Sequence, residues 1–248
     1  MDFTGRTALV TGSGAIGGLG HATARTLAAG GANVIITGTD PDRGAQVVDD
    51  VQSVAGSAAT VRFVAADLAD PRAVQQLADD AGKVDVLVNN AGVVPFGATT
   101  EQDIADFDAA FAVNVRAPFV LVARLAPRMA ARGGGSIVNV SSTAAGLGMP
   151  LMAAYGATKA ALESLTRTWA AEFAASNVRV NAVSPGPMTT AKVVAAMGPD
   201  LGGMGLTTAL KRTADPAEVA RVIAFVADDD ASYMTGAVVA ADGGRTAI

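Results

Sequence analysis

The sequence predicts a doubly wound α/β fold in which a seven-stranded parallel sheet carries helices on both faces. Short apolar, β-branched runs alternate along the 248 residues with longer helical patterns. Hydrophobicity within each run is continuous, which is typical of parallel strands buried on both faces. The helical segments supply the crossovers that such strands need. Because no repeat or linker divides residues 1–248, we expect a single domain.

The predicted strands are short and rich in valine and isoleucine. They cover Ala8–Val10, Val34–Ile36, Val61–Val64, Val84–Val88, Ile137–Val140, Val178–Val183 and Val238–Val239. The predicted helices are rich in alanine, and they cover His21–Ala29, Asp42–Val54, Pro71–Ala81, Ile104–Ala131, Ala153–Ala175 and Pro216–Ala227. Two of them have clear start signals, because Asp70-Pro71 and Asp215-Pro216 each place aspartate at the N-cap and proline at the first helical position.

Residues 187–213 depart from this alternation. Glycines, prolines and methionines interrupt a weak helical pattern in this segment. Long irregular segments in compact domains often act as lids or binding loops. We therefore expect a substrate-binding loop at 187–213.

Composition excludes several classes of site and partner. With no cysteine and one histidine, the chain has no disulfide or thiol nucleophile and little with which to bind zinc, so we expect no metal. A net charge of −5 without a cluster of basic residues argues against nucleic-acid binding. We find no charge-free apolar stretch of about 18 residues and expect no membrane helix. The start, Met1–Arg6, lacks the features of a secretory signal, so we expect a cytoplasmic protein.

The first predicted strand leads into a glycine-rich turn, Gly12-Ser13-Gly14-Ala15-Ile16-Gly17-Gly18-Leu19-Gly20, and then into a helix. Glycines let the backbone approach a pyrophosphate closely, and the helix N-terminus offers free N–H groups and a favourable dipole. We therefore expect Gly12, Ser13, Gly14, Gly18 and Leu19 to bind a dinucleotide. The alternative is a turn that serves only tight packing. His21, which follows the turn, is expected to be an exposed polar residue without a role.

The end of the second strand bears on the choice between NAD and NADP. A carboxylate at this point would hold the adenine ribose hydroxyls and select NAD, whereas an arginine would accept the phosphate of NADP. The chain has Gly38 and Thr39 here, with Asp40 slightly later and Arg43 later still. Because no acid at Gly38 repels the phosphate, the sequence favours NADP slightly over NAD. The choice stays open, and we expect Thr39 to contact the cofactor.

Polar residues follow the third, fourth and fifth strands. They are Asp67-Leu68, Asn89-Asn90-Ala91-Gly92 and Ser141-Ser142, and Asn114 interrupts an apolar helix. The carboxyl ends of parallel strands meet at one edge of the sheet, which is where α/β folds bind ligands. These residues therefore predict a polar binding edge, although Asp67 and Asn90 could each be only turn residues.

Tyr155 and Lys159 lie four residues apart, so a helix places them side by side. A tyrosine titrates near pH ~10, and bringing it to neutral pH requires roughly 4 kcal/mol. One cation about 4 Å away, at an effective dielectric constant of about 20, supplies roughly that amount. We therefore expect Lys159 to lower the pKa of Tyr155 and Tyr155 to transfer protons. The alternative is an ordinary pair of surface residues.

Taken together, the motifs resemble those of the short-chain dehydrogenase/reductases. The shared motifs are Thr11-Gly12 with Gly18-Leu19-Gly20, Asn89-Asn90-Ala91-Gly92, Asn114, Ser142, Tyr155-x-x-x-Lys159 and Pro185-Gly186. The resemblance covers essentially the whole chain, including Tyr233–Gly236 and Asp242–Gly244. It implies a Rossmann fold and an NAD(P)-dependent oxidoreductase that interconverts an alcohol and a ketone. It also implies a homotetramer or dimer built on the helices Ile104–Met129 and Ala153–Ala175.

The resemblance further implies roles for single residues. Tyr155 would be the general acid/base, and Ser142 would hydrogen-bond the reacting oxygen. Lys159 would lower the pKa of Tyr155 and hold the nicotinamide ribose, while Asn114 would position a water molecule that links Lys159 to solvent. The remaining implied contacts are to the cofactor, with Asn90, Ala91 and Gly92 lining it, Asp67 and Leu68 at the adenine, and Pro185, Gly186, Met188 and Thr190 at the nicotinamide end.

The glycine turn departs from the family pattern. Family members usually have three residues between the Thr-Gly pair and the next Gly-x-Gly, whereas this chain has five, Ser13–Gly17. The two extra residues either bulge outward or make a different turn around the pyrophosphate. The loop also lacks a basic residue, which weakens the preference for NADP.

The substrate is the part of the function that the sequence describes least. Methionines 149, 152, 188, 197 and 204 flank the predicted site as either core filler or an adaptable substrate wall. We expect Met149 and Met152 to contact the substrate along with Ser142 and Tyr155, and the nearby Leu147 and Leu151 suggest that it is apolar. One alternative is a 3-oxoacyl thioester reductase that docks an acidic carrier protein on Arg124, Arg128 and Arg132. Another is a catalytically silent dinucleotide-binding sensor.

Overall fold

The computed structural model describes residues 1–198 and 201–248. Its strands are β1 Thr7–Val10, β2 Asn33–Gly38, β3 Val61–Ala65, β4 Val86–Asn89, β5 Gly135–Val140, β6 Val178–Pro185 and β7 Val238–Ala241. They form one sheet in the order β3-β2-β1-β4-β5-β6-β7, and every neighbouring pair is parallel. The predicted fold class is confirmed.

Five of the six predicted helices are present with small shifts at their ends, and the sixth, Ile104–Ala131, is divided in two. The helices are α1 Leu19–Ala29, α2 Pro41–Gln52, α3 Pro71–Asp80, α4 Ile104–Phe111, α5 Ala117–Ala130, α6 Ala153–Phe173, α7 Ala191–Met197 and α8 Pro216–Ala227. Both predicted start signals are confirmed, because the side chains of Asp70 and Asp215 accept hydrogen bonds from backbone N–H groups of the first turn. Asp215 also shares a capping box with Glu218.

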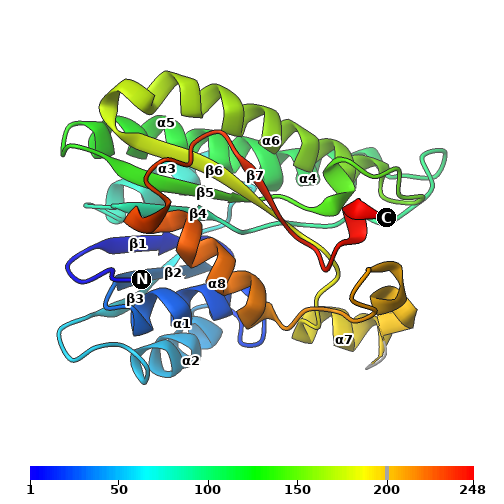
Figure 1. Ribbon diagram of the computed structural model, residues 1–248, viewed down its shortest axis with the longest axis horizontal. Helices are drawn as coiled ribbons and strands as arrows, with labels where there is room; N and C mark the ends of the chain where they lie inside the picture. The colour runs from blue at the N-terminus through cyan, green and yellow to red at the C-terminus, as the bar shows by residue number, and fades with distance from the viewer. Residues whose placement is uncertain (199–200) are drawn as a thin grey trace.

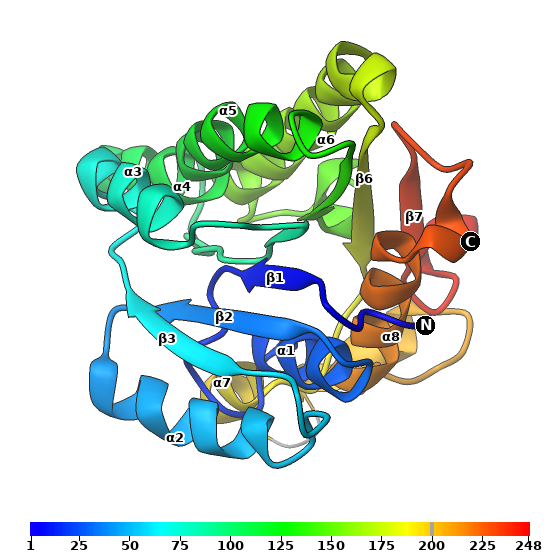
Figure 2. The same ribbon diagram turned by 90° about the vertical axis from the view of Figure 1, so that its left-hand side faces the viewer.

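The sheet separates two layers of helices (Figure 1). Helices α1, α2 and α8 cover one face, and α3, α4, α5 and α6 cover the other (Figure 2). Successive residues of β1 enter opposite cores, since Ala8 and Val10 pack with the first layer and Leu9 with the second. This two-sided burial explains why the strands read as continuous apolar runs.

The long helix predicted at Ile104–Ala131 is interrupted. A π-helical segment, Ala112–Arg116, separates α4 from α5 and has Asn114 at its centre. Pro118 follows within the first turn of α5 and has no N–H to donate to the carbonyl of Asn114. Such π-bulges occur frequently at functional sites.

The run Ile104–Ala130 is also long and apolar enough to cross a membrane, judged by length and composition alone. Half of its most apolar stretch is buried inside the molecule. The core helix of a soluble protein meets the same criterion, so this finding is weak support for a membrane span.

The segment predicted as irregular, 187–213, contains short helices. Helix α7 begins after Thr190, whose hydroxyl accepts a hydrogen bond from the N–H of Val193 at 3.3 Å. A 3₁₀ segment, Leu201–Thr207, follows it. Residues 199–200 of the predicted loop lie outside the described residues.

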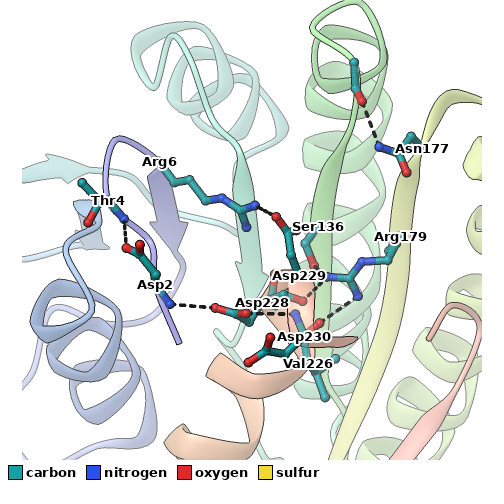
Figure 3. Close-up of polar contacts among 12 residues, drawn as sticks. Asp2, Thr4, Arg6, Ser136, Asn177, Arg179, Val226, Asp228, Asp229 and Asp230 are labelled. Carbon is teal, nitrogen blue, oxygen red and sulfur yellow. Dashed lines mark hydrogen bonds and ion pairs between the residues drawn. The ribbon is translucent and has the colours of Figure 1, made fainter. Parts of the chain in front are cut away.

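A polar network closes the amino-terminal edge of the sheet, opposite the strand ends that carry the predicted site (Figure 3). Arg179 of β6 donates hydrogen bonds to the carbonyls of Val226, Ala227 and Asp228 at the end of α8, at 2.8 to 3.1 Å. The chain start joins the same segment, because the N–H of Asp2 donates to the Asp228 carboxylate at 3.1 Å. Arg6 forms an ion pair with Asp229.

Candidate active site

Ser142 is the second residue after β5, at the carboxyl edge of the sheet. Its backbone is extended, and its hydroxyl accepts a hydrogen bond from the N–H of Ala144 at 3.2 Å. This contact starts a single 3₁₀ turn, Thr143–Ala145, that leads away from the sheet. The strand end and the turn together hold the Ser142 hydroxyl at the start of the segment leading to α6.

Tyr155 lies in the first turn of α6 and is half-buried. Burial raises the pKa of the Tyr155 phenol above its usual value, and the interaction with the Ser142 side chain lowers it by less. The two predicted catalytic side chains are therefore brought together. The expected lowering of the tyrosine pKa by Lys159 is wrong in this structure, because desolvation dominates.

Lys159 is almost fully buried, with 3% of its surface exposed. Its ammonium lies 5.6 Å from the centre of the Tyr155 ring and donates to the carbonyl of Val140, the last residue of β5, at 2.7 Å. Burial lowers the pKa of Lys159 from 10.5 to about 8. This hydrogen bond fixes α6 against the strand that carries Ser142.

Asn114 is fully buried and joins three parts of the site. Its side-chain oxygen accepts from the N–H of Val93, and its amide donates to the Val93 carbonyl, both at 2.9 Å. The amide also donates to the Thr158 hydroxyl at 3.0 Å, which in turn donates to the Tyr155 carbonyl at 2.7 Å. Asn114 thus ties the segment after β4 to the helix that carries Tyr155 and Lys159.

Gly92 borders the space between Asn114 and Lys159. A Cβ atom at Gly92 would lie 3.4 Å from Asn114 Oδ1 and 3.6 Å from Lys159 Nζ. A side chain larger than a methyl group would collide with both polar groups. The absence of a side chain therefore keeps this polar space open.

The glycine turn fits a dinucleotide phosphate because its backbone is tightly placed and nearly bare of side chains. Gly12 has φ +63°, and a Cβ atom on it would lie 2.6 Å from the Cα of Ala91. The N–H groups of Ser13 and Gly14 both donate to the carbonyl of Thr37 at the end of β2. Helix α1 then begins at Leu19 with its N-terminus at the carboxyl edge of the sheet.

Asn90 and Ala91 hold this turn in place. The Asn90 side chain donates to the carbonyls of Thr11 and Gly12 at 2.8 and 3.2 Å. The backbone N–H groups of Asn90 and Ala91 both donate to the Thr11 hydroxyl at 3.0 Å. The turn after β1 and the segment after β4 are therefore one unit. The side chain of Asn90 is occupied in positioning the turn.

The end of β2 presents Thr39, Asp40 and Arg43. Thr39 is exposed, as a residue that contacts a cofactor would be in the free protein. The carboxylate of Asp40 caps α2 through the N–H groups of Asp42 and Arg43, and its second oxygen accepts from the Arg43 guanidinium at 2.8 Å. The acid and the base that could distinguish NAD from NADP thus neutralise each other.

Asp67 and Leu68, the two residues predicted to contact the adenine, have different environments. Asp67 is exposed, and its side chain accepts from the N–H of Ala69, which makes the turn predicted as the alternative for this residue. Leu68 is 8% exposed and packs in the core behind the sheet. Both follow β3, at the same edge as the glycine turn.

The residues predicted to contact the nicotinamide end of the cofactor lie at the end of β6 and just after it. Pro185 ends the strand, and a Cβ atom on Gly186 would lie 2.8 Å from the backbone of Asp242. Met188 is partly buried against the core that also contains α1 and α8. Thr190 caps α7. These residues lead from the sheet edge into the segment predicted to bind substrate.

Met149 and Met152 lie half-buried on the turn before α6, close in sequence to Tyr155. The N–H of Met152 donates to the Met149 carbonyl at 3.2 Å, and Leu151 between them has φ +67° with 43% of its surface exposed. This strained turn presents apolar side chains to solvent beside the site.

Two polar residues of the site, Thr158 and His21, were not predicted to contribute to it. Thr158 acts through its hydroxyl and stands directly before Lys159. Thr11 was predicted only as part of the Thr11-Gly12 motif, and its hydroxyl accepts from the N–H groups of Asn90 and Ala91. His21 is 8% exposed rather than exposed, so the expectation for it is wrong. Among the described residues, no group of three or more histidine, aspartate or glutamate side chains is arranged to hold a metal ion.

The chain is similar to known proteins over almost its whole length. A family model described as enoyl-(acyl carrier protein) reductase matches residues 14–246. An uncharacterized oxidoreductase of Thermotoga maritima is 39% identical over 256 residues, covering 100% of both chains. The cis-4-hydroxycyclohexanecarboxylate dehydrogenase of Sinomonas cyclohexanicum is 39% identical, covering 99% of this chain and 98% of its own.

Solved structures of other proteins also match this chain over its whole length. A short-chain dehydrogenase/reductase family protein is 48% identical, with a TM-score of 0.92 and complete coverage of both chains. A candidate NAD(P)-dependent gluconate 5-dehydrogenase from Beutenbergia cavernae, with NADP bound at low occupancy, is 36% identical. Its TM-score is 0.91, and the match covers 100% of this chain and 99% of that one.

Proposed function

The chain belongs to the short-chain dehydrogenase/reductase family, and we propose that it uses Tyr155 to exchange a proton with an alcohol or ketone substrate. The protein is an NAD(P)-dependent oxidoreductase that acts on CH–OH or carbonyl groups. The nicotinamide cofactor supplies the hydride when it is bound. The residues of this chain supply binding, orientation and the proton.

The observation that carries the proposal is the joint placement of Ser142, Tyr155 and Lys159. Val140, two residues before Ser142, accepts the hydrogen bond of Lys159, and the Ser142 and Tyr155 side chains interact. In our proposal the Ser142 hydroxyl hydrogen-bonds the substrate oxygen and the phenol of Tyr155 gives it a proton. Lys159 holds the nicotinamide ribose, and Asn114 positions water beside Gly92.

The raised pKa of Tyr155 suits the proton-donating step of ketone reduction in our proposal. A phenol whose pKa is raised by burial keeps its proton at neutral pH and can donate it. Oxidation would require the phenolate, which burial disfavours.

For the cofactor, we propose NADP in preference to NAD. Its phosphates would lie on the glycine turn and the start of α1, with Thr39 and Arg43 near the adenine ribose. The NADP bound to the Beutenbergia cavernae relative supports this choice. Rotation of Arg43 away from Asp40 would free a cation for the extra phosphate.

For the substrate, we propose a small or medium, largely apolar carbonyl compound bound by the turn before α6 and by residues 187–213. Large apolar side chains remain exposed in the segments flanking the site, namely Val94, Phe96, Leu151, Met197, Leu206 and Leu210. Met149 and Met152 add adaptable surface.

Reduction of an acyl thioester on a carrier protein is less well supported. Arg124 and Arg128 pair with Asp79, and Arg132 donates to the carbonyl of Val84, two residues before β4 begins. Arg132 also lines a pocket with Arg179 at the amino-terminal edge of the sheet. This basic surface lies away from the edge that carries Tyr155.

Substitution of Tyr155 by phenylalanine tests the proposed function. We expect Tyr155→Phe to abolish reduction of a panel of apolar ketones, because the proton donor is lost, while NADPH still binds. Turnover is followed by NADPH absorbance and binding by NADPH fluorescence. The chain offers a matched control in its other tyrosine, since Tyr233 is fully exposed and Tyr233→Phe should leave turnover unchanged.

Two results would contradict this assignment. Undiminished turnover in Tyr155→Phe would refute the role of the phenol. Tight cofactor binding by the wild-type protein without turnover of any carbonyl compound or alcohol would instead indicate a silent sensor.

We also propose that α4, α5 and α6 pack against a second copy of the chain. A groove of about 530 Å³ on this face is lined by Phe111, Val115, Phe119 and Leu165. Phe119 is 51% exposed and Ile104 is 70% exposed, which is unusual for large apolar side chains gathered on one face.

Light scattering at micromolar concentration tests this interface. We expect a dimer or tetramer for the wild type and a smaller species for Phe119→Glu, because a carboxylate would be buried without a partner. A monomeric wild-type protein would exclude the interface.

Finally, we propose that the enzyme acts in the cytoplasm, free of membranes. In this proposal the apolar run Ile104–Ala130 is a core helix. Its residues Leu121, Leu125 and Met129 are fully buried against the sheet.

A further inference from the structure

His21 is held from both sides of its ring. Its Nε2 lies 2.6 Å from a carboxylate oxygen of Asp50 on α2, and its Nδ1 accepts a hydrogen bond from the N–H of Gly17 at 3.3 Å. The same Asp50 oxygen accepts from the guanidinium of Arg25 at 2.5 Å. A buried histidine thus connects the lengthened glycine turn to the helix layer behind it.

These contacts define which ring nitrogen carries the hydrogen. Because the N–H of Gly17 donates to Nδ1, that nitrogen is the acceptor, so Nε2 carries the hydrogen and donates it to Asp50. Asp50 therefore selects the tautomer that can hold Gly17.

A pocket of about 430 Å³ lies beside His21, between α1 and α8, and is also lined by Gly18, Arg25 and Asp215. The hydrogen bond to Asp50 orients the imidazole on the side of the ring away from Gly17.

Gly17 joins the glycine turn, which we propose binds the cofactor, to α7, which lies in the segment that we propose binds the substrate. Its carbonyl accepts from the N–H of Ala191, the first residue of α7, at 3.1 Å. Its φ is +80°, and a Cβ atom on it would lie 2.9 Å from the Cβ of Ala191. One backbone group of Gly17 is bound by His21 and the other by the start of α7.

We propose that His21 is a positioning residue which, through Gly17, sets the shape of the lengthened glycine turn and docks α7 against it. Asp50 orients His21 for this task. The inference rests on the proposed function, in which the turn holds the cofactor phosphates and residues 187–213 bind the substrate. The inference also accounts for the extra length of the turn, because the longer turn reaches α7 through Gly17.

Two substitutions of His21 separate the two hydrogen bonds. Asparagine places its side-chain oxygen where Nδ1 stands, so His21→Asn retains an acceptor for Gly17. Glutamine places its amide near Nε2, so His21→Gln retains the link to Asp50 and loses the acceptor. The variants are similar in polarity and differ in which contact survives.

We expect His21→Gln to raise the dissociation constant for NADPH by about five-fold, the factor that one hydrogen bond of ordinary net strength contributes. His21→Asn should raise the dissociation constant less than His21→Gln does, because it keeps the acceptor for Gly17 and loses only the orienting bond to Asp50. The same order is expected for the KM of the cofactor, whereas kcat at saturating cofactor should change less than about two-fold. Equal dissociation constants for the two variants would overturn the proposal, because a merely structural histidine would respond to both changes alike.

Substitution of Asp50, the partner of His21, provides a second test. Asp50→Ala should weaken NADPH binding in the same direction as His21→Gln, because the ring loses its orientation. The neighbouring Asp49 is exposed on the same helix, and Asp49→Ala is the matched control with unchanged binding. Wild-type affinity in Asp50→Ala would also overturn the proposal.

The binding measurement is independent of the catalytic assignment. NADPH fluorescence titration needs no turnover, so it reports on His21 even where Tyr155→Phe retains activity. Failure of the proposed function therefore appears in the turnover assay, and failure of this inference appears in the dissociation constants.

Discussion

Lys159 shows how depth, rather than spacing, determines the behaviour of a charged side chain. It stands where the sequence places it, one helical turn from Tyr155, yet it is buried with the Val140 carbonyl as its hydrogen-bond acceptor. Burial lowers the pKa of Lys159 to about 8 and raises that of Tyr155. Lys159 is therefore the first of the two groups to lose its proton as pH rises.

This order predicts the pH dependence of ketone reduction. Below about pH 8 the ammonium of Lys159 is charged and Tyr155 carries its proton, so both are in the proposed active form. Above about pH 8 the ammonium loses its proton, and we expect kcat/KM for the cofactor to fall. A pH profile of initial rates measures this, since kcat/KM reports groups of the free enzyme.

Lys159→Arg provides the comparison for this profile. A guanidinium stays charged throughout the range, so the variant should be slower but should lack the decline above about pH 8. A wild-type profile that remains flat to about pH 10 would show that deprotonation of Lys159 does not limit the reaction.

At the scale of the elements, the position of α6 relative to the turn at Thr143–Ala145 sets the site. A Cβ atom on Gly156 would lie 2.7 Å from the carbonyl oxygen of Ala144, so helix and turn touch through backbone atoms. This contact brings the first turn of α6, with Tyr155, against the turn that begins at Ser142.

Gly156→Ala should therefore reduce activity by separating these two elements. We expect kcat to fall at least roughly tenfold, because a misplacement of about 1 Å can cost about 100-fold in rate. Gly56→Ala is the control, since a Cβ atom there meets nothing within 4 Å. Steady-state kinetics with both variants checks this, and equal kcat values would show that α6 tolerates the shift.

Elements with a strong periodic pattern could be predicted from the sequence, and features that depend on distant partners could not. All seven strands were predictable because each contains a short apolar, β-branched run, and the aspartate caps of α3 and α8 are local signals. The π-helical segment depends on bonds from Asn114 to Val93 and Thr158, which only the folded chain brings together.

The same distinction holds within the candidate site. The motif residues Ser142, Tyr155 and Lys159 could be located by spacing, but the directions of their pKa shifts depend on burial, which spacing does not report. His21 resembled an exposed residue because its partner Asp50 lies on another helix. Its contact with Gly17 depends on the path of the lengthened turn.

At the scale of the whole molecule, Arg179 stabilises the edge opposite the site. Its guanidinium donates to carbonyls at the end of α8 and to Met234 at 3.3 Å, and burial lowers its pKa from the usual value. A cation at a helix C-terminus also interacts favourably with the helix dipole. One side chain thereby joins β6, α8 and the segment before β7.

Arg179→Ala should lower the free energy of unfolding by about 2 to 4 kcal/mol, because several buried carbonyls lose their donor. The KM of the cofactor should stay unchanged, since the site lies at the other edge. Urea denaturation and steady-state kinetics measure the two quantities, with the exposed Arg167→Ala as the control. Wild-type stability in Arg179→Ala would show that water replaces the guanidinium without loss.

The pairing of β1 with β4 has a consequence for synthesis of the chain on the ribosome. In the finished sheet Ala8 stands opposite Val86, so β1 waits for a partner that is made much later. Until then β1 and β2 present an apolar strand edge without its neighbour, and such edges promote aggregation. The pairing of β1 with β4, which brings the glycine turn and Asn90 together, is therefore also a point at which the nascent protein can aggregate. We expect chaperone binding before residue 86 is made to improve the yield of folded enzyme.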